Sequence, residues 1–316
     1  MTVVPTQAPA PVRTGAPGPG AKAHLSHRLA ERGVDRSLFL LVPGLVFLVL
    51  LFIYPFLNGL SLSFQPVNKH ATDALWNYKQ FFSQPYLYNS LIITLRISLP
   101  AALINVLASI PIAFRLRGRF RGKRLLTTLL VIPITLGTVL TAEGMINYLG
   151  PVGWLNKVLI DLHLTTQDSP IPLIKNYWGV VISLIISGFP FAFLLILSYL
   201  SGIDPSLEAA AATLGASATK RFWQITFPLL APGLAITFCL TFVLAFSVFP
   251  SAYLVGDPSN TTHVISITAY DAAYSDFDYS MASAVAMIMA AVMLLVISLV
   301  LWGRGRLYRG ATGGKG

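Results

Sequence analysis

The sequence has very little charge. Only 11% of its 316 residues are Asp, Glu, Lys or Arg, whereas soluble domains carry about 25%. Hydrophobic residues make up 55% of the chain, and a bilayer needs about 20 apolar residues for each helical crossing. The composition therefore predicts a membrane protein with several spans. The net charge of +10 is interpreted from where the basic residues lie, because cytoplasmic loops of membrane proteins collect Lys and Arg.

Residues for catalysis or for metal binding are also scarce. The single cysteine, Cys239, lies within an apolar run, which excludes a disulfide framework and a Cys-based metal site. A phosphate-binding G-x-x-x-x-G-K-[ST] loop is missing, since the stretch 118–124 is one residue short and ends in Arg. We therefore expect no enzyme, no metal site and no cofactor bound by this chain. The histidines are scattered in the leader and loops, without metal-site spacing: His24, His27, His70, His163 and His263.

Long apolar stretches dominate the rest of the chain. Each is long enough to cross a bilayer as a helix, and none shows the alternating pattern of a β-barrel strand. Prolines inside them predict kinks, which spanning helices tolerate. The sequence thus predicts an all-α protein with about six transmembrane helices. The expected spans are roughly 38–64, 89–114, 125–149, 176–200, 232–255 and 279–302.

The two ends of the chain differ from this membrane domain. We expect a leader over 1–36, a transmembrane domain over 37–303 and a basic tail over 304–316. The first part of the leader is rich in Ala, Pro and Gly, which predicts disorder. Its last part has arginines four residues apart, which fits either a short helix on anionic headgroups or a solvated basic segment.

Basic residues are distributed unevenly between the loops. Most Lys and Arg lie in the leader, in the loops after the second and fourth spans, and in the tail, whereas the remaining loops carry most of the acids. By the positive-inside rule, both termini and the loop over 204–232 are expected in the cytoplasm. We therefore expect a multi-pass protein of the inner or plasma membrane.

The loop over 204–232 has the signals of two short helices. Asp204 can cap a helix that starts with Pro205, and Gly215 can supply the left-handed residue that ends it. Ser217 can cap a second helix. The alanines between Glu208 and Thr213 are small enough for another backbone to approach closely. This pattern predicts a helix, a tight turn and a helix that together form a docking face.

The order of residues in this loop resembles a known motif. Glu208-Ala209-Ala210, then Gly215-Ala216, then Ile225 and Pro228 is similar to the "EAA" loop of permease subunits of binding-protein-dependent ABC importers. The resemblance implies a type I importer permease fold, in which the first helix of the loop inserts into a cleft of a separate ATPase. ATP and Mg would be bound by that ATPase. It also implies a second permease subunit and an extracytoplasmic solute-binding protein as partners. The coupling residues it implies are Glu208, Ala209, Ala210, Gly215 and Ala216.

Two ionisable residues lie inside predicted spans. Arg96 in the second span and Glu143 in the third are expected at similar depth. An intramembrane charge is a functional hypothesis by default. We expect them to line the translocation path or to brace the two spans, at a depth where they could form an ion pair. The alternative is a purely structural pair or snorkelling to the surface.

The substrate is less clearly indicated. Leu214-Gly215-Ala216 resembles the polyamine branch of the importer family, whereas the stretch 258–284 resembles the sugar branch. The acids and tyrosines of the latter stretch would favour cations or would form a loop that docks a binding protein. The favoured prediction is a polyamine or related organic ion, with a sugar as the alternative. An ion-coupled secondary transporter is a more remote alternative, which an EAA loop would not serve.

Overall fold

The computed structural model describes residues 37–66, 73–118, 122–166 and 169–307. Within these ranges all regular structure is helical, apart from one isolated bridge between Thr166 and Ser169. Six of the described helices are long and apolar enough to cross a membrane, which confirms the predicted class and number of spans. The predicted leader over 1–36 and the tail after 307 lie outside the described residues.

Most of the first span belongs to a unit of its own, and its last residues belong to the next unit. The span consists of α2 (Ser37–Leu48), the π-helical turn η1 (Val49–Ile53) and α3 (Tyr54–Ser63), which follow one another without a break. The chain divides after Asn58 into two compact units. From Leu41 to Leu57 the first unit exposes apolar side chains on all sides, as expected of a helix surrounded by lipid or by other spans.

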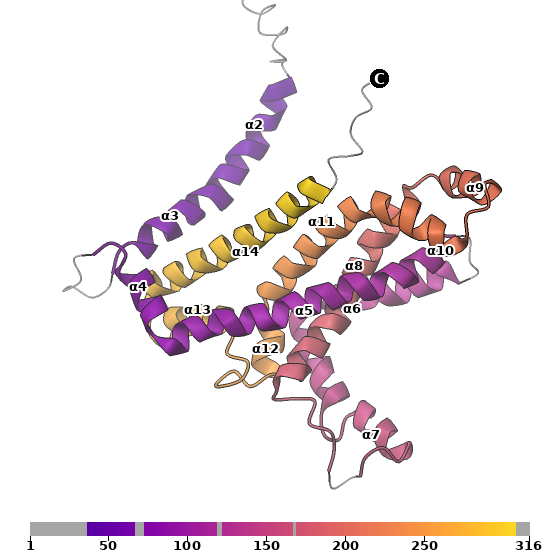
Figure 1. The fold of residues 1–316 in the computed structure, drawn as a ribbon. Helices are drawn as coiled ribbons and strands as arrows, with labels where there is room; N and C mark the ends of the chain where they lie inside the picture. Colours follow the sequence, from indigo (N-terminus) through magenta and orange to yellow (C-terminus); the bar gives the residue numbers. More distant parts are fainter. Residues whose placement is uncertain (1–36, 67–72, 119–121, 167–168, 308–316) are drawn as a thin grey trace, which may run out of the picture. The chain divides into compact units, whose positions relative to one another are not determined.

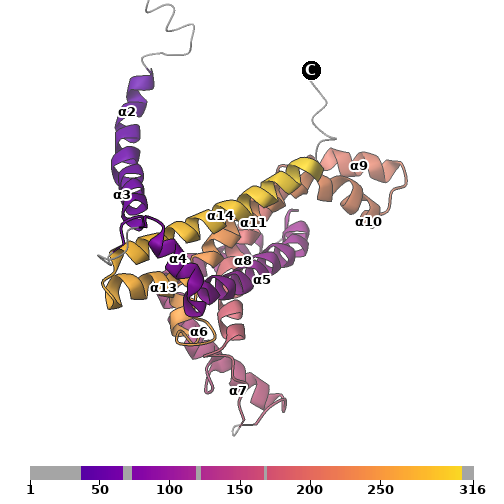
Figure 2. The same ribbon diagram turned by 60° about the vertical axis from the view of Figure 1, so that its left-hand side comes forward.

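The second unit is built around three packed helices (Figure 1). These are α5 (Pro85–Leu116), α8 (Tyr177–Ser201) and α11 (Phe227–Phe246), each of which contacts the other two. Helix α6 (Lys123–Leu149) packs against α8, and α14 (Tyr279–Leu307) runs alongside α11 (Figure 2). The core therefore comes from helices that are far apart in the sequence.

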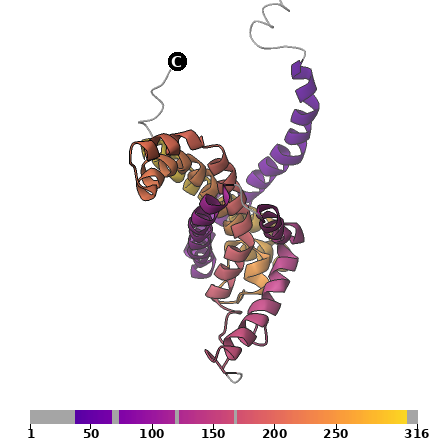
Figure 3. The same cartoon turned by 90° about the vertical axis from the view of Figure 1, so that its right-hand side faces the viewer.

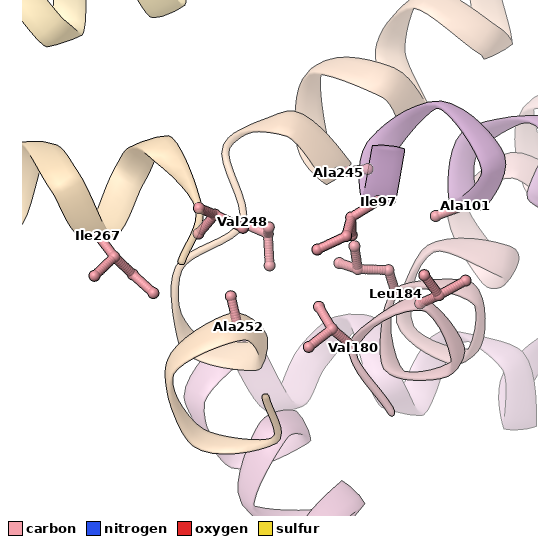
Figure 4. Close-up of a cluster of buried hydrophobic side chains, with 10 residues drawn as sticks. Ile97, Ala101, Val180, Leu184, Ala245, Val248, Ala252 and Ile267 are labelled. Atoms are coloured by element: carbon pink, nitrogen blue, oxygen red, sulfur yellow. The ribbon is translucent and has the colours of Figure 1, made fainter. Parts of the chain in front are cut away.

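The centre of this unit is filled by small and branched side chains (Figure 4). Ile97 and Ala101 of α5 face Val180 and Leu184 of α8, and all four are buried. Ala245 closes the cluster from α11. Small residues at these contacts allow the helix backbones to approach closely, which is how spanning helices pack in lipid.

Short helices connect the long ones at the ends of the bundle. They are α4 (Trp76–Ser83), α7 (Trp154–Asp161), α12 (Pro250–Leu254), α13 (Ile265–Tyr270) and the π-helical turn η3 (Asp271–Ser275). Figure 1 places α7 and the loop helices α9 and α10, described below, at different ends of the second unit.

The fifth span differs from its predicted range of 232–255. The helix begins at Ala218, passes through α10 (Ala218–Arg221) and η2 (Phe222–Thr226) into α11, and ends at Phe246. Pro250 has no N–H to continue the ladder, and the residue before a proline is pushed out of the helical region, as the φ of −128° at Phe249 shows. The apolar run after Phe246 is therefore a break and a new short helix.

Helix α14 continues to Leu307, past residue 304 where the basic tail is expected to begin, and that boundary stays a prediction. In the third span, α6 contains a residue with non-helical backbone, Gly137, at φ 75° and ψ 170°. This glycine, four residues after Pro133, interrupts the helix. The two halves of α6 therefore run in different directions.

Candidate translocation cavity and coupling loop

The loop between the fourth and fifth spans folds as its sequence predicts. In α9 (Pro205–Thr213), Asp204 caps the helix by accepting the Ser206 N–H at 2.8 Å. Gly215 has a φ of +82°, where a side chain would be strained. Ser217 then caps α10 by accepting the Lys220 N–H at 3.4 Å. The helix–turn–helix is confirmed.

One face of α9 is apolar and open to solvent. Ala209 and Ala210 are exposed, as is Leu207. Leu214 at the turn is 88% exposed, the highest value among the exposed large hydrophobic residues of the described chain. A large aliphatic side chain in this position gains stability only when another surface covers it. We call Leu207, Ala209, Ala210, Thr213 and Leu214 the outer face of the coupling loop.

Glu208 points to the other side of the same helix. Its Oε1 and Oε2 accept hydrogen bonds from Arg117 Nη1 at 2.6 Å and Nη2 at 2.5 Å, and Thr226 Oγ1 donates to Oε1 at 2.5 Å. The bonds from Arg117 hold the pKa of the Glu208 carboxyl below its usual value, against the opposing effect of partial burial. Glu208 is therefore an ionised, internally bonded residue.

Arg117 is itself held in place. Its guanidinium lies 4.2 Å from the centre of the Phe114 ring, which packs edge-on against Phe222 with 5.1 Å between ring centres. From the sequence, Arg117 was only one of the basic residues that set the topology. No local pattern pairs it with Glu208, which lies 91 residues away.

A cavity of about 380 Å³ lies where the broken helices meet. Gly137, at the interruption of α6, lines it, and so do residues of the break between α11 and α12. In a chain that spans a membrane, non-helical backbone is tolerated where it lines a cavity. Figure 3 shows the second unit from the side, with the helical loop between the fourth and fifth spans and α7 at opposite ends. The lining consists of Asn105, Pro133, Ile134, Gly137, Thr138, Thr141, Leu184, Ser187, Gly188, Phe191, Thr241, Leu244, Ala245, Ser247, Val248, Phe249, Pro250 and Ser251.

The polar groups of this cavity are neutral. Hydroxyls and one amide provide them, and the lining contains no Asp, Glu, Lys, Arg or His. Asn105 is 2% exposed; its Nδ2 donates to the Leu184 carbonyl at 3.2 Å, while its Oδ1 has no hydrogen-bond partner. A buried amide oxygen without a partner is costly, which makes Asn105 an unusual residue of the lining.

Several cavity hydroxyls donate to the backbone and keep their lone pairs free. Thr141 Oγ1 donates to the Gly137 carbonyl at 2.6 Å, and Thr241 Oγ1 donates to Thr237 at 2.8 Å. Ser187 Oγ likewise donates to Ser183 at 2.8 Å. A hydroxyl that donates in this way can still accept a hydrogen bond. Sequence reasoning missed these residues, because single Ser, Thr and Asn residues are common in spanning helices.

Arg96 and Glu143 do not meet. Both are exposed, and the ion pairs between described residues are Lys79 with Asp73 and Arg117 with Glu208. Neither residue lines the cavity. Arg96 instead lies in an apolar depression with Tyr177. The expected pair is therefore wrong for this structure, and a role in the translocation path stays a prediction.

Aromatic rings lie around α12, and those of Tyr253 and Tyr270 are exposed. Phe249, which lines the cavity, stacks on Tyr253 with ring centres 5.4 Å apart and contacts Tyr270 at 5.1 Å. Among the acids once expected to attract cations, Asp278 accepts the Met281 N–H at 2.8 Å at the start of α14. Burial raises the pKa of Asp271. At least one of these acids, Asp278, thus has a structural role at the start of a helix.

A polytopic helical bundle, a neutral central cavity and a capped helical loop between its fourth and fifth spans define a membrane permease. Residues 103–306 match the model of the binding-protein-dependent transport system inner membrane component, and the chain belongs to that family. It is therefore an ABC importer permease subunit, a transport component rather than an enzyme.

Three relatives cover most of the chain. A trehalose/maltose permease, MalF of Thermococcus litoralis, is 29% identical over 90% of this chain and 97% of its own. The trehalose permease SugA of Mycobacterium tuberculosis is 28% identical over 83% and 85%. A probable sulfate permease, cysT of Prototheca wickerhamii, is 27% identical over 66% and 79%.

A solved structure has the same fold. A chain of a bacterial ABC transporter that imports the acidic polysaccharide alginate matches with a TM-score of 0.74 and 20% identity, over 90% of this chain and all of that one. The polyamine branch suggested by Leu214-Gly215-Ala216 receives no support from these relatives, and the sugar alternative does.

Proposed function

We propose that this chain is the permease subunit of an importer for a neutral sugar, such as a disaccharide. The observation that carries the proposal is the composition of the cavity, in which hydroxyls and the Asn105 amide are present and charges are not. The relatives named for trehalose and maltose support it.

The physical argument concerns the cost of removing the solute from water. A polyamine or a sulfate ion would lose its hydration in this cavity without an opposite charge to replace it, which is unfavourable in a membrane interior. A sugar is neutral, and each of its hydroxyls can exchange water for a Ser, Thr or Asn partner. The cavity of about 380 Å³ is within the range of small-molecule sites.

The energy for uptake would come from outside the chain. In this proposal both termini and the coupling loop are cytoplasmic, and the outer face of the loop docks on a separate ATPase that binds ATP and Mg. A second permease subunit and an extracytoplasmic solute-binding protein would complete the importer. The distribution of basic loops and the family support this arrangement. Ala209, Ala210 and Leu214 offer the small and apolar surface needed for docking.

The substrate class can be tested with the assembled importer in proteoliposomes. We expect ATP-dependent uptake of a radiolabelled disaccharide such as trehalose or maltose, competed by unlabelled sugar and not by spermidine or sulfate. Competition by spermidine alone would overturn the sugar assignment. Uptake by the lone chain that follows a proton gradient and needs no ATPase would favour a secondary transporter instead.

The cavity itself needs a matched pair of variants. Ser187→Ala removes a hydroxyl from the cavity lining, whereas Ser201→Ala removes one outside it that makes the same kind of bond to the preceding turn. We expect the first to raise the KM for sugar and the second to leave it unchanged. Equal behaviour of the two variants would show that the cavity does not contact the solute.

A further inference from the structure

The carboxylate of Glu208 joins three elements that are separated in the sequence. Glu208 belongs to α9, Arg117 follows directly after α5, and Thr226 ends the π-helical turn η2 from which α11 continues. Arg221, in α10, adds a hydrogen bond from Nη1 to the Glu208 carbonyl at 3.4 Å. The acidic residue of the loop is thus bonded inside the chain rather than presented on the outer face.

We infer that Arg117 is a positioning residue, and that its bonds to Glu208 make the coupling helix α9, the end of α5 and the start of α11 move as one body. We call Arg117, Glu208 and Thr226 the carboxylate clamp. The inference rests on the proposed function in one respect, since a separate ATPase must displace α9. It assigns to Glu208 a role in transmission and leaves docking to the outer face.

The geometry of the clamp suits the transmission of force. Two parallel N–H···O bonds between a guanidinium and a carboxylate fix both distance and orientation, which a single bond would not. The side chains of Arg117 and Glu208 are 26% and 15% exposed, so solvent screens the pair less than it would a surface pair. The guanidinium of Arg117 also packs against the face of the Phe114 ring.

The clamp is connected to the cavity through α5. This helix is continuous from Pro85 to Leu116 and packs along α8. It carries Asn105, twelve residues before Arg117, which corresponds to about 18 Å along a helix axis. A displacement of α9 by the ATPase would therefore reach Asn105 in the cavity lining through this one helix, which is continuous across Pro111.

The test compares variants of the clamp in the complete importer, with uptake, ATP hydrolysis and association of the ATPase measured on the same preparations. Arg117→Ala removes both hydrogen bonds, and Arg117→Lys keeps the charge without the bidentate geometry. Arg117→Glu combined with Glu208→Arg restores an opposite pair. Arg115→Ala is the matched control, because Arg115 is an exposed residue of the same segment with no bonded partner among the described residues.

We expect Arg117→Ala to lower the number of solutes imported per ATP hydrolysed by about tenfold, within the usual range of couplings between sites. The ATPase should remain associated with the variant. Arg117→Lys should lie between this variant and the wild type, the exchanged pair should recover part of the ratio, and Arg115→Ala should equal the wild type.

Two results would overturn the clamp. In the first, Arg117→Ala and Glu208→Gln keep the wild-type ratio of uptake to hydrolysis. In the second, Glu208→Gln releases the ATPase while Arg117→Ala has no effect, which would make Glu208 a docking residue. A failure of the proposed function is distinguishable from both, because the wild-type importer itself would then show no ATP-dependent sugar uptake.

Discussion

The coupling loop and the cavity of this permease use opposite kinds of chemistry. In the loop, a carboxylate is bonded to a guanidinium through two hydrogen bonds and to a hydroxyl through a third. In the cavity, the polar groups are neutral and the amide oxygen of Asn105 has no partner. The Glu208 carboxylate of the loop is thus bonded within the chain, although Arg221 Nε in the same loop has no partner, whereas the polar groups that line the cavity carry no charge.

This difference follows from what each region must do. A part that transmits movement must not deform, and charged bidentate bonds give it a fixed geometry. A part that passes a solute across a membrane must bind it well enough to admit it and weakly enough to release it. Neutral hydrogen bonds, each worth about 0.5–1.5 kcal/mol net, suit that second task better than buried charges.

The largest effect is expected on the outer face of the loop. Ala209→Arg would place a long charged side chain where a docked surface leaves no space or partner. An uncompensated buried charge costs about 3–5 kcal/mol, so we expect the ATPase to be lost and uptake to fall at least about a hundredfold. Co-purification in detergent measures the association directly.

Its control is Ala74→Arg, which adds the same side chain at an exposed alanine just before α4. This variant should retain the ATPase and normal uptake. Retention of the ATPase by Ala209→Arg would contradict the assignment of the outer face and would leave Ala210 and Leu214 without a role in docking.

A smaller effect is expected in the cavity. Asn105→Leu removes the unpartnered acceptor while keeping a side chain of similar size. The loss of about one hydrogen bond to the solute should raise the KM about tenfold, since 1.4 kcal/mol corresponds to a factor of ten. The uptake measured at saturating sugar, the amount of folded protein and the association of the ATPase should change little.

If Asn105→Leu instead lowers uptake and protein level together, the amide is a structural residue, and the distinction between a bonded loop and an open cavity disappears. Asn105→Asp keeps the size of the side chain and changes its charge. It keeps an acceptor but introduces an anion, so a neutral sugar should be bound more weakly and a cation should gain access.

A still smaller effect is expected at Gly188, which faces Asn105 across the contact of α8 and α5. A Cβ at this position would lie 2.5 Å from Asn105 Nδ2, so Gly188→Ala should push the amide away from the Leu184 carbonyl. We expect a KM about threefold higher, corresponding to less than about 1 kcal/mol. Gly144→Ala, where a Cβ meets open space, is the matched control for uptake.

The sequence predicted local structure well and distant contacts poorly. The caps of α9 and α10 and the turn at Gly215 follow from neighbouring residues, and these predictions are confirmed. The predicted end of the fifth span at 255 is wrong, because hydropathy continues through a break that the backbone at Phe249 and Pro250 imposes.

The prediction of site residues from the sequence was limited in the same way, because it depends on contacts between distant residues. The expected pair of Arg96 and Glu143 rested on equal depth in two spans, and depth does not determine the side of a helix on which a residue lies. The pair that does form joins residues 91 positions apart, and only the packing of α5 beside the coupling loop brings them together. Likewise, Asn105 is recognisable as a site residue only once the fold brings it to the lining of a cavity.

The smallest effect is a pH dependence of stability that is expected in the coupling loop and not in the cavity. The pKa of Glu208 lies below its ordinary value of 4.5, chiefly because of the hydrogen bonds from Arg117. The carboxylate therefore contributes stability above pH 4.5, and this contribution is lost as the pH falls through the lowered pKa. Arg117 and Arg221 are the charged groups that face it.

Thermal unfolding of the purified chain below and above pH 4.5 should therefore show a loss of stability that Glu208→Gln lacks. The pKa of Asp204 is also lowered, by its bonds to Ser206, so the comparison is made in an Asp204→Asn background. Sugar binding by the cavity, which has no titratable lining residue, should be unchanged over the same range. A stability loss of equal size in the Glu208→Gln variant would show that the carboxylate contributes nothing, because charged and neutral forms would then hold the loop equally well.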